Sequence, residues 1–263
     1  MMFTSKLKNL ILTLFICLVT PQVNAGSQNR DDAILPIEDI AVISKKVEKY
    51  AAQHRARVFF IARQGRPTKE LPDGVNYTHV SYAVYSNIET EDGRTVPGYA
   101  IYNLYQLKDD PSRSHLIVDF PLDFLAGAYA AKVGVIIPTR DLQKRLLEVI
   151  KSDSYEKLHN PSYSAISNPY NAKYQNCTEH VLDVLNASIY QTDDIEQLKI
   201  NTQAHFDAQE LKISPFKLFL ASLLKSEVKT SDHKRGIKTT TFGSIANYLQ
   251  SNGLAEDVVH IGI

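Results

Sequence analysis

Residues 77–107 read YTHVSYAVYSNIETEDGRTVPGYAIYNLYQL. Two parts of this stretch, residues 77–85 and 99–107, are rich in the aromatic and β-branched residues that favour strands. A polar segment containing Asp92-Gly93, a common hairpin turn, separates them. The stretch therefore predicts two antiparallel strands in the first half of the chain.

Further strands and helices are predicted on both sides of this hairpin. Strands are expected within 57–63, at 115–120 and at 133–137, with short extended pieces at 227–229 and 237–241. Helices are expected at 37–54, 122–131, 139–151, 177–189, 193–209, 214–226 and 242–250. Residues 159–176 hold two Asn-Pro pairs and predict a long loop. The pattern indicates an α+β fold, in which an antiparallel sheet packs against the helix that begins at Cys177.

The first 25 residues have the layout of a secretory signal. Lys6 and Lys8 precede an apolar run at residues 10–19, and the segment ends in Val23-Asn24-Ala25. We expect cleavage after Ala25, a polar tether at 26–36, and one domain at 37–263 with a helical C-terminal extension. The mature protein is expected to be exported, periplasmic or secreted.

The composition excludes several classes of protein. The 263 residues carry 29 basic and 29 acidic side chains, so there is no basic excess of the kind that nucleic-acid binding requires. No second long apolar run follows the signal, so no membrane span is expected in the mature chain. Of the two cysteines, Cys17 lies in the signal, which leaves Cys177 as a single thiol.

Cys177 is the main candidate for chemistry because it lies at the predicted start of a helix. Unpaired backbone N–H groups and the positive end of the helix dipole stabilise a thiolate there, which lowers the pKa of a thiol below about 8.5. The same N–H groups can bind an oxyanion. The alternative is an inert cysteine packed on the inner face of the helix.

A nucleophilic cysteine needs a base, and His79 is the leading candidate. Strand alternation places His79 with Ser81 and Ala83 on one face, where the small side chains leave room for a helix N-terminus. The group that orients the imidazole is either Asn103 or Gln106, which point to opposite faces of the partner strand.

Other residues are candidates for substrate contacts. Arg63 ends a strand beside the hairpin and either anchors a substrate carboxylate or is a surface charge. Tyr170 and Asn176 belong to the loop at 159–176, which either walls a cleft or is purely structural. Cys177 and His180 have a C-x-x-H spacing, but further zinc ligands do not cluster nearby, so neither a metal nor a cofactor is expected.

The order of these residues resembles that of circularly permuted papain-like hydrolases, the NlpC-type amidases and endopeptidases with the lecithin retinol acyltransferase group. The acyltransferase run Asn-Cys-Glu-His-Phe-Val is similar to 176–181 here, although Thr178 shifts the Glu and His by one position. Nearly the whole mature chain also resembles domain-of-unknown-function family 2145. The motifs that carry this second resemblance are 61–66, 78–80, 103–106, 119–127, 168–171, 175–179 and 241–245.

The first resemblance implies a cysteine hydrolase of permuted papain-like fold that acts on a cell-envelope peptide or amide. Cys177 would be the nucleophile, His79 the proton carrier, and Asn103 or Gln106 the orienting residue. Ester or thioester acyl transfer is one alternative, and a non-catalytic envelope binding module is the other. The substrate and the oligomeric state are not predicted.

Overall fold

The computed structural model describes residues 33–90 and 92–263. The predicted signal segment therefore lies outside the described residues, as does most of the predicted tether. No helix in the described part of the chain is long and apolar enough to cross a membrane.

Six strands form one antiparallel sheet in the order β4-β3-β2-β1-β5-β8. Their bounds are β1 Val58–Arg63, β2 His79–Glu89, β3 Thr95–Gln106, β4 Ser114–Asp119, β5 Lys132–Pro138 and β8 Ala255–Gly262. The predicted hairpin is confirmed as β2 and β3, in which Tyr82 pairs with Tyr102. Gly93 in its turn has φ +77°, a left-handed conformation that favours glycine.

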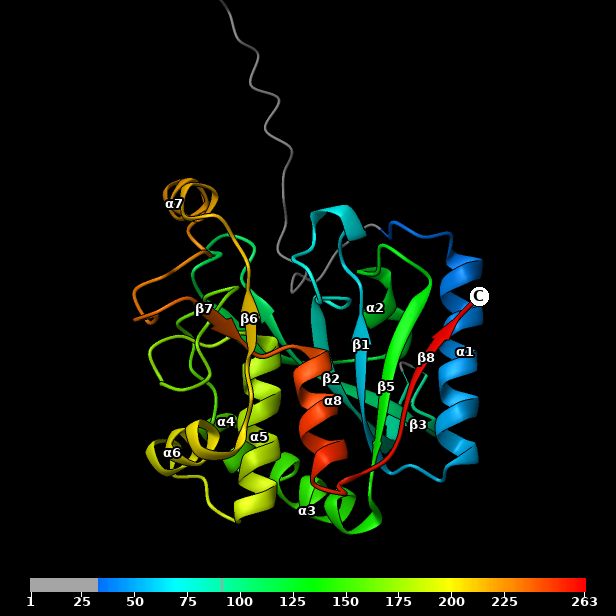
Figure 1. Ribbon diagram of the computed structural model, residues 1–263. Coiled ribbons are helices and arrows are strands. Elements are labelled where there is room, and N and C mark those ends of the chain that lie inside the picture. Colours follow the sequence, from blue (N-terminus) through cyan, green and yellow to red (C-terminus); the bar gives the residue numbers. More distant parts are fainter. Residues whose placement is uncertain (1–32, 91) are drawn as a thin grey trace, which may run out of the picture.

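Helices cover both faces of the sheet (Figure 1). One face packs against α1 Ile37–Gln53 and α2 Pro121–Ala126, and we call it the α1 face. The other packs against α3 Arg140–Ile150, α5 Cys177–Tyr190 and α8 Phe242–Ser251, and we call it the α5 face. The predicted α+β class, with an antiparallel sheet against the helix that begins at Cys177, is therefore confirmed.

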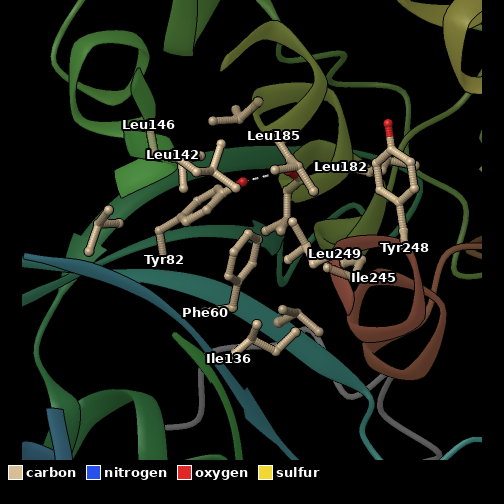
Figure 2. Packing of buried hydrophobic residues seen from close by; sticks show 14 of the residues in the cluster. Phe60, Tyr82, Ile136, Leu142, Leu146, Leu182, Leu185, Ile245, Tyr248 and Leu249 are labelled. Carbon is tan, nitrogen blue, oxygen red and sulfur yellow. Dashed lines mark hydrogen bonds between the residues drawn. The ribbon is translucent and has the colours of Figure 1, made fainter. Parts of the chain in front are cut away.

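The alternation of side chains along β2 divides the hydrophobic core into two parts. Val80, Tyr82 and Val84 pack in the cluster on the α5 face, whereas Ala83 belongs to the cluster on the α1 face. Figure 2 shows Tyr82 beneath the α5 side chains, where its hydroxyl donates to the Val181 carbonyl at 2.7 Å. This register determines which β2 side chains face α5.

The structure departs from expectation in several places. The helix predicted at 122–131 ends at Ala126, and α4 Ser154–Lys157 was not predicted. The predicted helix at 193–209 ends early, as α6 Ile195–His205, and β6 Gln209–Leu211 follows it. The predicted extended piece at 227–229 is not a strand, whereas the piece at 237–241 contains β7 Ile237–Thr239, which pairs with β6. The chain ends in β8, an edge strand whose side chains are mostly half-exposed and which was not predicted. The remaining elements are η1 Thr68–Glu70 and α7 Pro215–Leu224.

Candidate functional site at Cys177

Asn176 caps the N-terminus of α5. Its side-chain oxygen accepts hydrogen bonds from the Glu179 backbone N–H at 2.9 Å and from the Thr178 hydroxyl at 2.8 Å. Its amide nitrogen donates to the Ala165 carbonyl at 3.2 Å. Both ends of the Asn176 side chain are therefore engaged in holding the start of the helix, although the residue also borders the cavity described below.

Cys177 is the first residue of α5 and is 2% exposed. Its sulfur lies 3.9 Å from the Thr78 carbonyl oxygen, and its side chain packs with Leu104 and Tyr163. Since Leu104 alternates with Asn103 along β3, these contacts place the thiol on the α5 face of the sheet.

A cavity of about 370 Å³ adjoins Cys177. Its wall comes from the segment that joins β1 to β2, from the loop before α5, and from the segment between β6 and α8. Most of this wall is apolar, and its main apolar side chains are Leu71, Val75, Tyr163, Ile166, Leu211 and Ile213. A concave, mainly apolar cavity beside a few polar groups is the usual form of a small-molecule site.

His79 lies in a different network, on the α1 face. Its Nε2 atom is 3.0 Å from the Asn103 side-chain oxygen and 3.2 Å from the Ser81 hydroxyl. The ring stacks on Tyr105 with centroids 5.0 Å apart, and it also contacts Phe124 of α2. The side chain is fully buried, and its Nδ1 atom has no hydrogen-bond partner among the described residues.

Asp119 extends this network away from His79. Its carboxylate accepts hydrogen bonds from the Asn103 amide at 2.6 Å and from the Tyr105 hydroxyl at 2.9 Å. The amide orientation is thereby fixed, with the Asn103 oxygen toward His79. Burial and the nearby Arg63 charge lower the pKa of His79 well below its usual value, so the imidazole is neutral at pH 7. Burial raises the pKa of Asp119 to about 7.

Cys177 and His79 therefore lie on opposite faces of the sheet. We expected the small Ser81 and Ala83 to admit the start of the helix, but α5 packs against the other side of β2. The reason is that the larger apolar side chains of β2, such as Tyr82, point to that side and bury more surface against α5. The structure brings His79 and Asn103 together but does not bring Cys177 to them.

The remaining predicted site residues lie elsewhere. The Arg63 side chain is fully buried between the rings of Tyr105 and Phe124 and donates to the Phe124 carbonyl, so it is not a surface charge. Tyr170 borders a second cavity, where its hydroxyl donates to the Phe206 carbonyl at 3.0 Å. Gln106, the alternative to Asn103, donates to the Pro111 carbonyl at 2.8 Å.

A buried charged cluster on α5 and α6 was not foreseen. The Lys199 ammonium lies 2.7 Å from a Glu179 oxygen and 2.8 Å from an Asp183 oxygen, and all three side chains are at most 7% exposed. Burial raises the pKa of Glu179 to about 8 and also raises that of Asp183. Glu179 and Asp183 are four residues apart and so share a face of α5, beside the apolar run of Val181, Leu182 and Val184; this spacing is the sequence signal for a buried cation nearby.

Within residues 33–90 and 92–263, no three His, Cys, Asp or Glu side chains cluster in a way that can hold a metal ion. No curated protein and no solved structure matches the chain. A family model matches residues 50–249 and carries the description "Uncharacterized protein conserved in bacteria (DUF2145)". This match covers well over half of the sequence, so the chain belongs to the DUF2145 family of bacterial proteins.

Proposed function

We propose that this protein is a non-catalytic binding module of the bacterial cell envelope, which holds an apolar ligand in the cavity at Cys177. The observation that carries the proposal is the apolar wall of this cavity, with the helix-start thiol at its edge. The separation of His79 from Cys177 supports binding over catalysis. The signal-like residues 1–25 support an envelope location.

A cysteine hydrolase or acyltransferase is the second candidate, and the position of Cys177 favours it. Backbone N–H groups in the first turn of α5 can stabilise a thiolate and an oxyanion. The thiolate would attack the carbonyl of an envelope peptide, amide or ester, and the amine or alcohol would leave with a proton from His79, which Asn103 orients. Water, or a second nucleophile in acyl transfer, would then release the acyl group from Cys177. This chemistry needs the start of β2 to rearrange, so that the imidazole reaches the α5 face.

Binding of a neutral apolar dye tests the proposal. N-phenyl-1-naphthylamine fluoresces when it leaves water, and we expect wild-type protein to bind it and the dye to protect Cys177 from iodoacetamide. Ala221 lies on α7 in the cavity wall, so Ala221→Phe fills part of the space and should weaken binding. The matched control is Ala41→Phe on exposed α1 surface, which should bind as wild type.

Two results would count against this proposal. One is dye binding that is equal in the Ala221→Phe and Ala41→Phe variants, because the dye would then sit outside the cavity. The other is turnover of an amide or ester that disappears in both Cys177→Ser and His79→Gln, which would favour the hydrolase.

A further inference from the structure

A groove of about 230 Å³ lies between α8 and the edge strand β8, and we call it the α8–β8 groove. Residues of the segment before β2 close one end of it. Among the described residues that line the groove, none is an Asp, Glu, Lys or Arg. The groove therefore offers no formal charge to a ligand, unlike the cavity at Cys177, whose lining includes charged side chains.

The floor of the groove is apolar and partly aromatic. Tyr77 and Phe242 are 3% and 4% exposed, and their rings meet edge to face with centroids 4.9 Å apart. Buried Ala246 and half-buried Val258 continue this floor along α8 and β8. The negative faces of aromatic rings attract C–H groups, so such a floor suits the C–H face of a ligand.

The rim is polar and uncharged. It carries the exposed amides of Asn76, Asn247 and Gln250, of which the last two are three residues apart and share a face of α8. None of these side-chain amides forms a hydrogen bond with another residue in the part of the chain that the structure describes. Each can donate and accept at once, which is the pattern that neighbouring hydroxyl groups of a ligand require.

His260 completes the rim as a neutral ring. Its Nδ1 atom lies 2.7 Å from the Tyr77 hydroxyl, and the two rings stack with centroids 5.6 Å apart. Burial and the charge of Lys132, which lies outside the lining, lower the pKa of His260 below 6.5, so the imidazole is uncharged at pH 7. The rim therefore stays uncharged from neutral pH upward.

An apolar floor under an uncharged hydrogen-bonding rim matches a sugar ring, which has a face of C–H groups and an edge of hydroxyls. We propose that the α8–β8 groove binds a neutral pyranose, one ring of an oligosaccharide. Its C–H face lies on Tyr77 and Phe242, and its hydroxyls face the rim amides. An alkyl chain would leave these amides unused, and an ion would find no opposite charge in the lining. This site is separate from apolar binding at Cys177 and does not depend on it.

Saturation-transfer-difference NMR on the wild-type chain tests the proposal with neutral disaccharides. Cellobiose, maltose, lactose, chitobiose and mannobiose cover the common pyranoses and linkages. At least one should bind, and its ring C–H protons should receive the strongest saturation from the aromatic floor. The affinity should stay the same when the salt concentration is raised about tenfold, because the contacts involve no charge pair.

Variants locate the sugar. A Cβ at Gly243 on α8 would meet only the Thr241 hydroxyl, at 3.8 Å, so Gly243→Leu should fold, fill the groove and abolish sugar binding. Its matched control is Ala52→Leu on exposed α1 surface, which should bind as wild type. Asn247→Ala and Gln250→Ala should each weaken binding about two- to tenfold, the effect of one neutral hydrogen bond.

Three results would overturn the proposal. They are the absence of saturation transfer to every disaccharide, binding that persists in Gly243→Leu, and an affinity that falls steeply with salt. Binding of N-phenyl-1-naphthylamine should be unchanged in Gly243→Leu. Loss of sugar binding with intact dye binding would therefore show that the two sites are independent.

Discussion

Lys199→Met should destabilise the protein strongly, because it removes the cation from a buried cluster. The Lys199 ammonium lies 2.7 Å from Glu179 and 2.8 Å from Asp183, and both carboxylates are inaccessible to solvent. Asp183 keeps one other donor, the Gln175 amide at 2.9 Å. A methionine of similar length leaves two acids together in the core without a compensating charge.

The expected cost is about 3–5 kcal/mol of unfolding free energy, the usual range when one partner of a buried ion pair is removed. The cost should be larger at pH 8 than at pH 5. Burial raises the pKa of both acids, so at low pH they are protonated in the folded protein and no longer need the cation. At high pH the variant either buries an ionised carboxylate without a cation or keeps the acid protonated although the unfolded chain has released the proton, and each alternative lowers the free energy of unfolding.

Urea unfolding followed by circular dichroism measures the effect at both pH values. Lys157→Met is the matched control, because Lys157 forms an equally short pair with Asp193 at 2.6 Å, but on the surface. A triple variant with Lys199→Met, Glu179→Gln and Asp183→Asn should recover most of the stability. The reasoning is refuted if Lys199→Met costs no more than Lys157→Met.

Three further predictions concern the sheet. Burial raises the pKa of Asp119 from 3.8 to about 7, so between these pH values the folded protein holds a proton that the unfolded chain has released. The free energy of unfolding should therefore fall as the pH rises from 4 to 7, by at most ~1.4 kcal/mol per pH unit. Asp119→Asn should flatten this part of a plot of urea midpoint against pH, and an unchanged slope would contradict the prediction. Gly127→Ala should cost about 1–3 kcal/mol in urea unfolding, because a Cβ at this position would clash with the buried Arg63 guanidinium; a neutral substitution would contradict this contact. Tyr82→Phe should cost about 1 kcal/mol in the same assay by removing the bond to Val181, whereas a stabilised variant would show that the bond contributes nothing.

Much of the sheet could be predicted because its strands carry local signals. The hairpin of β2 and β3 follows from alternation and from the Asp92-Gly93 turn, and the start of α5 follows from the cap at Asn176. By contrast, β8 carries charged and half-exposed residues, and only its pairing with β5 makes it a strand. Such long-range pairing leaves no pattern within the strand itself.

Individual candidate residues could be named from the sequence, but their arrangement in space could not. The His79–Asn103 contact was among the sequence hypotheses, with Gln106 as the alternative to Asn103. Which face α5 covers depends on the relative size of the two sets of β2 side chains, and small Ser81 and Ala83 indicated the wrong one. The Cys177 cavity was not predicted either, because three separated segments build its wall.

The central claim is that Cys177 and His79 belong to separate sites, and the pH dependence of Cys177 alkylation tests it most directly. The rate of iodoacetamide labelling is followed by mass spectrometry in wild type and in His79→Gln, with circular dichroism to verify that the variant is folded. We predict the same midpoint in both proteins, because the neutral imidazole on the α1 face does not contact the thiol. A midpoint that rises by roughly one pH unit or more in His79→Gln would reveal a thiolate–imidazolium pair and contradict the account.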